Sequence, residues 1–185
     1  MNIIQTGIEG LIVIEPKVFG DARGYFFESY NQNEFAKVGI STVFRQDNQS
    51  FSRYGVIRGL HFQLQPYTQT KLIRAVEGVI YDVAVDLRKG SPAFGKWFGI
   101  ELSAENKKQL YIPQGFAHGF SVLSEQVVIQ YKCDNFYHPQ AEGGLRYDDP
   151  QLGIDWKVNT AQAIISDKDK ILPALNELET NFEFL

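Results

Sequence analysis

Apolar and polar residues alternate along much of the chain. The clearest case is Val79–Leu87, where the odd-numbered positions are all apolar and the even-numbered positions include Asp82 and Asp86. A side-chain period of two is that of a β-strand with two different faces. Comparable short runs predict strands at Leu11–Glu15, Tyr25–Tyr30, Gly55–Gln65, Lys71–Val76, Trp97–Leu102, Gln109–Pro113, Gly119–Leu123 and Val127–Cys133.

Glycine, proline and polar residues separate these runs, so that strands recur about every 8–12 residues. That spacing, with few helical stretches, predicts an all-β protein built as a double-stranded jelly roll. A short helix is predicted over Asn31–Val38, with Asn31 as its N-cap and Gly39 at its end. Asp167–Leu175 and the tail are helical or irregular. Neither a repeat nor a linker interrupts the sequence, so residues 1–185 are expected to form one domain.

Charge and composition argue against several kinds of binding partner and site. The net charge is −4 with both signs interspersed, which argues against a nucleic-acid ligand. The N-terminus lacks the pattern of a targeting segment, and no apolar run reaches the roughly 18 residues of a membrane span. A soluble cytoplasmic protein without membrane contact is expected. The single cysteine, Cys133, excludes an intramolecular disulfide and a paired-cysteine metal site.

The strand Gly55–Gln65 carries the main candidate for chemistry. His61 lies on its polar face, and Lys71 follows at the start of the next predicted strand. Gly59 inside the strand predicts a bulge, which would let Arg58 share a pocket with His61. A base beside a guanidinium and an ammonium suits proton removal next to a carbonyl in a phosphate-bearing substrate. The alternative is a structural histidine beside a surface arginine, and spacing alone favours that alternative.

Other polar residues have two readings each. His118 is a core residue or a substrate ligand, and Tyr131 is catalytic only if its hydroxyl faces a cavity opposite His61. Arg23, beside Gly24, is a phosphate contact at a tight turn or a partner in a surface salt bridge.

Two further polar clusters are just as open. Gln46, Asp47 and Asn48 form an ordinary turn or a pocket rim, whereas Lys168 and Asp169 lie in what reads locally as a solvated turn. No metal is expected, because the chain has three histidines and the His-x-His pair of a jelly-roll metal site is absent.

Several segments, taken in order, resemble the dTDP-4-dehydrorhamnose 3,5-epimerase family, from about Gly7 to Pro173. The segments are FGDARGYFFESY, RQDNQSFSRYGVIRGLHFQ, QTKLIRAVEGVIYDVAVDLRKGSPAFGKW, QLYIPQGFAHGF, YKCDNFYHPQAEGGLRYDDPQLGIDW and SDKDK. The resemblance implies a cupin-like jelly-roll homodimer that acts on dTDP-4-keto-6-deoxyglucose without a metal or other cofactor, in dTDP-L-rhamnose biosynthesis for cell-surface polysaccharide.

The resemblance also implies roles for individual residues. His61 matches the general base, Asp169 the carboxylate that pairs with it, Lys71 the residue beside the C4 oxygen, and Tyr131 the general acid on the opposite face. Asp82, facing the presumed cavity, is a candidate for a supporting residue. The remaining matches are substrate contacts: Arg23, Glu28, Gln46, Asp47, Asn48, Arg58, His118, Tyr137, Glu142 and Lys168.

Some features depart from the family pattern or lie outside it. Tyr147 stands where the family usually has tryptophan, and Lys157 replaces a proline; both are expected to affect packing or nucleotide preference. The tail, residues 174–185, is a dimer contact or disordered, and Leu11–Tyr30 is the segment expected to be shared between subunits. Two other functions remain open: an epimerase that inverts one centre of a related nucleotide sugar, and a non-catalytic sugar-binding jelly roll.

Overall fold

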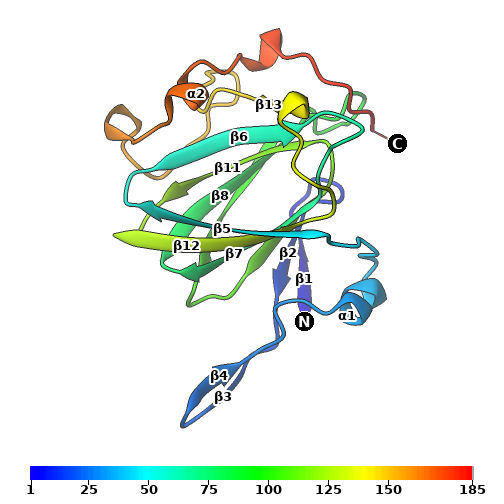
Figure 1. Ribbon diagram of the computed structural model, residues 1–185, viewed down its shortest axis with the longest axis vertical. Coiled ribbons are helices and arrows are strands. Elements are labelled where there is room, and N and C mark those ends of the chain that lie inside the picture. Colours follow the sequence, from blue (N-terminus) through cyan, green and yellow to red (C-terminus); the bar gives the residue numbers. More distant parts are fainter. Residues whose placement is uncertain (185) are drawn as a thin grey trace.

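Two antiparallel sheets face each other in the computed structural model, which describes residues 1–184 (Figure 1). The six-stranded sheet has the order β1 (Asn2–Gln5), β2 (Ile12–Glu15), β10 (Gln109–Ile112), β7 (Lys71–Glu77), β12 (Gln126–Cys133) and β5 (Gln46–Arg53). The five-stranded sheet has the order β13 (Glu142–Gly144), β6 (Ile57–Gln63), β11 (Phe116–Val122), β8 (Val79–Asp86) and β9 (Trp97–Ser103). This arrangement confirms the all-β, cupin-like jelly roll predicted from the sequence.

Strand β8 of the five-stranded sheet contributes apolar side chains to a hydrophobic core on each of its two faces. Ile80 and Ala84 face the space between the sheets and pack in the main core, whereas Val83 and Val85 pack in a second cluster. The C-terminal part of the chain covers that second cluster, in which Trp156 is 1% exposed. Burial of β8 on both faces removes apolar surface from water, and the hydrophobic effect makes that burial stabilising.

The predicted helix is present as α1 (Gln32–Lys37). The side chain of Asn31 accepts hydrogen bonds from the first free backbone N–H groups of the helix, and Gly39 continues the chain at a φ of 87°. Phe35 of this helix packs on Ile12 and Ile14, so α1 covers part of the outer face of the six-stranded sheet.

A two-stranded hairpin leaves the body of the molecule (Figure 1). Strands β3 (Phe19–Asp21) and β4 (Gly24–Phe26) pair with each other and, within residues 1–184, with no other strand. Tyr25 and Phe26 are 61% and 66% exposed. The hairpin therefore presents large apolar side chains that its own chain does not bury.

The C-terminal segment arches over β6 (Figure 1). It contains α2 (Asp167–Lys170) and a short 3-10 helix at Leu175–Glu177; two others lie at Pro139–Ala141 and Thr160–Gln162. Near its end, Lys89 donates a backbone hydrogen bond to Phe182 and accepts one from Phe184. Phe182 is 1% exposed and its ring contacts Phe62. Of the two alternatives expected for the tail, disorder does not describe residues 174–184, which pack on their own chain, and dimer contact stays a prediction; Leu185 lies outside the described residues.

The two departures from the family pattern lie in the cover of the five-stranded sheet. The indole N–H of Trp156 donates to the carbonyl of Tyr147, and Lys157 pairs with Asp155 at 2.5 Å. Tyr147 packs against the second cluster, whereas Lys157 is exposed, and neither residue lines the cavity between the sheets. Across residues 1–184, no helix has the length and apolar character needed to cross a membrane.

Candidate active site

A bulge in β6 brings two of the predicted site residues to one surface. His118 of β11 pairs with His61, but Phe120 pairs with Arg58, so β6 contains one additional residue between these positions. Gly59 lies in this bulge with a φ of 118°, and a Cβ atom there would meet the Cα of Gly119 at 2.6 Å. Only glycine fits, and the bulge turns Arg58 toward the cavity that His61 lines.

The cavity occupies one end of the space between the two sheets, with a volume of about 490 Å³. A neighbouring hollow of about 270 Å³ shares three of its lining side chains: His61, Lys71 and Tyr131. His61 comes from the five-stranded sheet, whereas Lys71 and Tyr131 come from the adjacent strands β7 and β12 of the six-stranded sheet. A molecule bound here would lie between the histidine on one wall and the tyrosine on the other.

His61 is held by a buried carboxylate. Its Nε2 lies 2.7 Å from Oδ1 of Asp169, and the other carboxylate oxygen accepts the backbone N–H of Gly59 at 3.1 Å. Burial raises the pKa of Asp169, but the hydrogen bond from His61 and its charge, together with the Gly59 N–H, outweigh burial and leave that pKa lower than usual for an aspartate. An ionised Asp169 accepts the Nε2–H of His61, so Nδ1 is the nitrogen with a free lone pair.

Burial shifts the pKa values of the two groups opposite His61, Tyr131 and Lys71, in opposite directions. It raises the pKa of Tyr131 above its usual value, with a smaller contribution of the same sign from Cys133, so the phenol remains protonated at neutral pH. Burial lowers the pKa of Lys71, although Cys133, Asp82 and Glu142 act in the opposite direction. The cavity thus pairs a proton donor with an ammonium of unusually high acidity.

A second histidine–carboxylate pair lies beside the first. Nε2 of His118 is 2.8 Å from Oδ1 of Asp82, and Asp82 is fully buried on β8. Burial lowers the pKa of His118 more than Asp82 raises it, so the ring is neutral at neutral pH and donates Nε2–H to the carboxylate. Nδ1 of His118 is then a hydrogen-bond acceptor.

Polar side chains of β5, β13 and the segment before Pro139 line part of the second hollow, and α2 contacts one of them. Lys168 of α2 pairs with Glu142 of β13 at 2.6 Å, and the hydroxyl of Tyr137 donates to the same carboxylate oxygen at 2.8 Å. Gln46 donates to Asn48 at 3.0 Å and accepts the backbone N–H of Tyr137 at 3.1 Å. The structure therefore brings eleven of the predicted site residues together around the two hollows: His61, Tyr131, Asp169, Lys71, Gln46, Asn48, Arg58, His118, Tyr137, Glu142 and Lys168.

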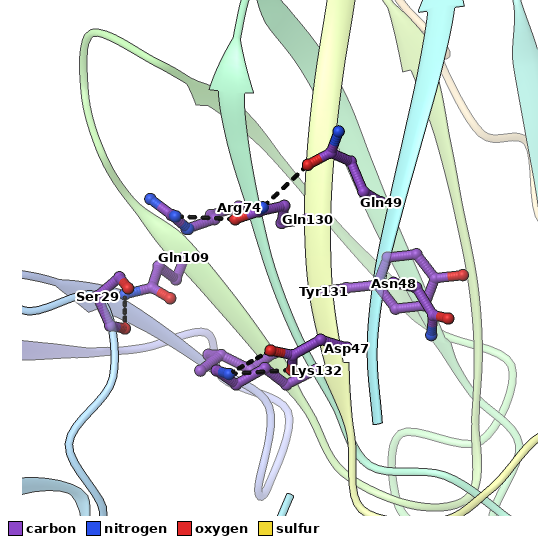
Figure 2. A pocket seen from close by; sticks show the side chains of 10 residues that line it. Ser29, Asp47, Asn48, Gln49, Arg74, Gln109, Gln130, Tyr131 and Lys132 are labelled. Carbon is purple, nitrogen blue, oxygen red and sulfur yellow. Dashed lines mark hydrogen bonds and ion pairs between the residues drawn. The ribbon is translucent and has the colours of Figure 1, made fainter. Parts of the chain in front are cut away.

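The side chains of Asp47, Arg23 and Glu28 are not part of this group. Strand β5 begins at Gln46, so Asp47 faces the opposite side of the sheet from Asn48 and pairs with Lys132 at 2.9 Å. Figure 2 shows this outer hollow, from which Tyr131 and Asn48 point away. The expectation of three neighbouring side chains at one rim is corrected for Asp47, because alternation along a strand separates them.

Arg23 and Glu28 lie farther along the chain toward the hairpin. Arg23 is at the β3–β4 turn with its side chain 90% exposed, where it pairs with Asp21 at 2.5 Å. Glu28 accepts a hydrogen bond from Asn31 near α1. Neither side chain lines the His61 cavity of its own chain.

The sequence did not indicate some lining residues. Ser50 is on the same face of β5 as Gln46 and Asn48, and the alternation would have identified it had the strand been recognised. Ile164 and Ser166 come from an irregular segment and had no local signal. Within residues 1–184, no three or more His, Cys, Asp and Glu side chains gather closely enough to hold a metal ion.

Comparison with known proteins identifies the family of the chain. A profile described as dTDP-4-dehydrorhamnose 3,5-epimerase matches residues 5–177. The enzyme of that name from Shigella flexneri is 54% identical over 170 residues, which cover 91% of this chain and 93% of the relative.

Solved structures agree with the profile. A dTDP-6-deoxy-D-glucose-3,5-epimerase from Legionella pneumophila, in complex with dTDP-4-keto-L-rhamnose, has a TM-score of 0.92 and 50% identity over 96% of this chain and 94% of its own. A 3′-monoepimerase from Streptomyces bikiniensis, in complex with dTDP-quinovose, has a TM-score of 0.86 and 33% identity, with coverages of 91% and 85%. The chain belongs to the dTDP-4-dehydrorhamnose 3,5-epimerase family.

Proposed function

We propose that the protein inverts C3 and C5 of dTDP-4-dehydro-6-deoxyglucose to give dTDP-4-dehydro-L-rhamnose, as an isomerase of dTDP-L-rhamnose biosynthesis. The observation that carries this proposal is the cavity in which His61, supported by Asp169, faces the protonated Tyr131 across the space between the sheets, with Lys71 beside them. Removing a proton on one face of a carbon and returning one on the other inverts that carbon.

The steps follow from the protonation states. Nδ1 of His61 takes the proton from the carbon next to the C4 ketone, and the C–H electrons form an enolate. The ammonium of Lys71 stabilises the negative charge on the C4 oxygen. Tyr131 then donates its hydroxyl proton to the opposite face of the carbon. Since C3 and C5 are both next to the same carbonyl, one lysine serves both inversions, and no electrons are gained or lost overall.

The relatives support the choice of a thymidine-diphosphate sugar. The Legionella structure holds a 4-keto product in a protein that is 50% identical to this chain. Arg58 and Lys168 supply positive charge near the cavity, as a diphosphate requires. Tyr137 is proposed to stack on the base, and Gln46, Asn48, His118 and Glu142 to contact the rest of the substrate. The cytoplasmic location expected from the sequence stays a prediction.

Incubation with dTDP-4-keto-6-deoxyglucose in deuterated water tests this function. Proton NMR is expected to show deuterium at both C3 and C5, and a downstream reductase is expected to trap a rhamno-configured product. Label at one carbon would identify a single-centre epimerase instead. Absence of label from a substrate that binds would support a sugar-binding protein and contradict the proposal.

We further propose a homodimer in which one chain completes the site of the other. Arg23 and Glu28 match the family's substrate contacts but lie outside the cavity of their own chain, on and next to the projecting hairpin. The exposed Tyr25 and Phe26 of that hairpin are suited to burial against a second copy. A partner's hairpin would bring a guanidinium to the substrate's diphosphate.

Mixing two inactive variants distinguishes this arrangement from a site within one chain. Arg23→Ala and His61→Ala chains are expected to be weakly active alone, and to regain about a quarter of wild-type activity when combined in random dimers. Half of the mixed chains then form heterodimers, each with one site that has both residues. If Arg23 acts in its own chain, the mixture stays as inactive as its components. Reassembled wild-type dimers are the control for recovery.

A further inference from the structure

The fully buried carboxylate of Asp82 has an oxygen without a partner. Its Oδ1 accepts from His118 at 2.8 Å, whereas Oδ2 is inaccessible to solvent and has no hydrogen bond. A buried charge is costly unless a neighbouring group compensates it. On β8, Asp82 is on the face that looks into the space between the sheets, and its negative charge acts on the ammonium of Lys71, which lines the cavity from the opposite sheet.

The other ionisable groups around Lys71 are neutral or engaged elsewhere. Cys133 of β12 is a neutral thiol, because burial raises its pKa to about 11. Glu142 of β13 is paired with Lys168 at 2.6 Å, and Asp169 of α2 is paired with His61 at 2.7 Å. The groups from β6, β11 and β12 are bases, a cation or a protonated phenol: His61, Arg58, His118 and Tyr131.

We propose that Asp82 is a positioning residue for enolate stabilisation: its buried carboxylate holds Lys71 as the ammonium and fixes His118 with its proton on Nε2. This inference rests on the proposed role of Lys71 beside the C4 oxygen. A neutral lysine could not stabilise the enolate charge, and desolvation favours the neutral form. The negative charge of Asp82 offsets that tendency.

The same carboxylate decides what His118 offers to a substrate. With Nε2–H donated to Asp82, Nδ1 can only accept, so His118 is suited to a sugar hydroxyl and not to the enolate oxygen. Lys71 is then the group that meets the developing oxyanion. The two effects give the cavity a cation on one sheet, Lys71, and a hydrogen-bond acceptor on the other, His118.

Asp82→Asn tests the inference, because the amide has the same size without the charge. The alkaline limb of the kcat profile, where Lys71 loses its proton, is expected to move to lower pH by roughly one unit or more. Lys71→Arg assigns the limb: a guanidinium does not titrate in this range, so in that variant the limb should move up to the pH at which Tyr131 loses its proton. A folded Asp82→Asn protein with an unmoved limb would overturn the proposal.

Asp86→Asn is the matched control. Asp86 lies on the same strand and face, is also fully buried, and binds Arg88 and Ser91 instead of a site residue. The Asp86→Asn substitution is expected to lower the melting temperature without moving the alkaline limb of the kcat profile. An equal shift of that limb in both variants would contradict a specific role for Asp82. If the wild-type enzyme incorporates no deuterium, the proposed function itself is refuted. That result differs from an unmoved limb in Asp82→Asn, which refutes only the role of Asp82.

A measurement on the unmodified protein covers the case in which Asp82→Asn does not fold. The ring nitrogens of His118, assigned by nitrogen-15 NMR among the three histidines, are expected to show the Nε2–H form at neutral pH. The Nδ1–H form would mean that Asp82 does not set the tautomer, and would overturn the proposal.

Discussion

Replacing His61 with alanine is expected to lower kcat by roughly 10²–10⁴-fold, the scale for loss of a positioned general base. The variant has no group at the position of His61 to take the proton next to the ketone. The other histidine of the cavity, His118, lies on a different strand, β11, and is held there by its hydrogen bond to Asp82. Deuterium incorporation at C3 and C5 should fall by the same factor as turnover. Stopped-time NMR of both carbons measures the two rates together.

A binding measurement distinguishes loss of the general base from damage to the substrate-binding pocket. The affinity for dTDP, measured by calorimetry, should be nearly unchanged in His61→Ala because the proposed nucleotide contacts, Arg58, Lys168 and Tyr137, keep their side chains. Asp169→Asn is a second variant: its amide can donate to Nε2 and so favours the tautomer with the proton on Nδ1, which is unable to act as a base. Wild-type turnover in His61→Ala would sink the mechanism.

Alternation along the chain predicted much of the sheet structure correctly. Val79–Leu87 has the two faces that the sequence indicates, and Gly59 lies at the bulge expected between Arg58 and His61. Strand β5 was not predicted, since Phe51 is the only apolar residue in Gln46–Arg53. Its inner face lines a polar cavity, so the usual apolar signal of a buried strand is absent. Because polar residues line the cavity, this strand lacks the alternation of apolar and polar residues from which strands were predicted.

Contacts between distant segments could not be predicted from local sequence. Asp169 reads as part of a solvated turn, yet it is 3% exposed and bonds to a histidine 108 positions earlier. The capping of α2 by Ser166 is a local signal, but it says nothing of where the helix docks. Only the resemblance to a family indicated this pairing before the fold was known. The pairing of Asp82 with His118 needed the register of β8 and β11.

Replacing Tyr131 with phenylalanine is expected to lower product formation by roughly 10²–10⁴-fold while proton exchange continues at a measurable rate. Abstraction by His61 precedes the return step and does not need the phenol. In deuterated water the enolate is then quenched from the His61 side, so the substrate gains deuterium without inversion. NMR of the recovered substrate, with the product trapped by a reductase, follows both processes.

Tyr111→Phe makes the same chemical change on the other face of the same sheet. Tyr111 of β10 packs in the cluster under α1, and its hydroxyl lies 2.8 Å from that of Thr42, so its loss should leave turnover unchanged. If exchange and turnover fall together in Tyr131→Phe, the division of labour between the two walls of the cavity is wrong. If exchange survives with retention of configuration, each wall supplies one proton transfer, and the separation of His61 and Tyr131 on opposite sheets is what makes the reaction an inversion.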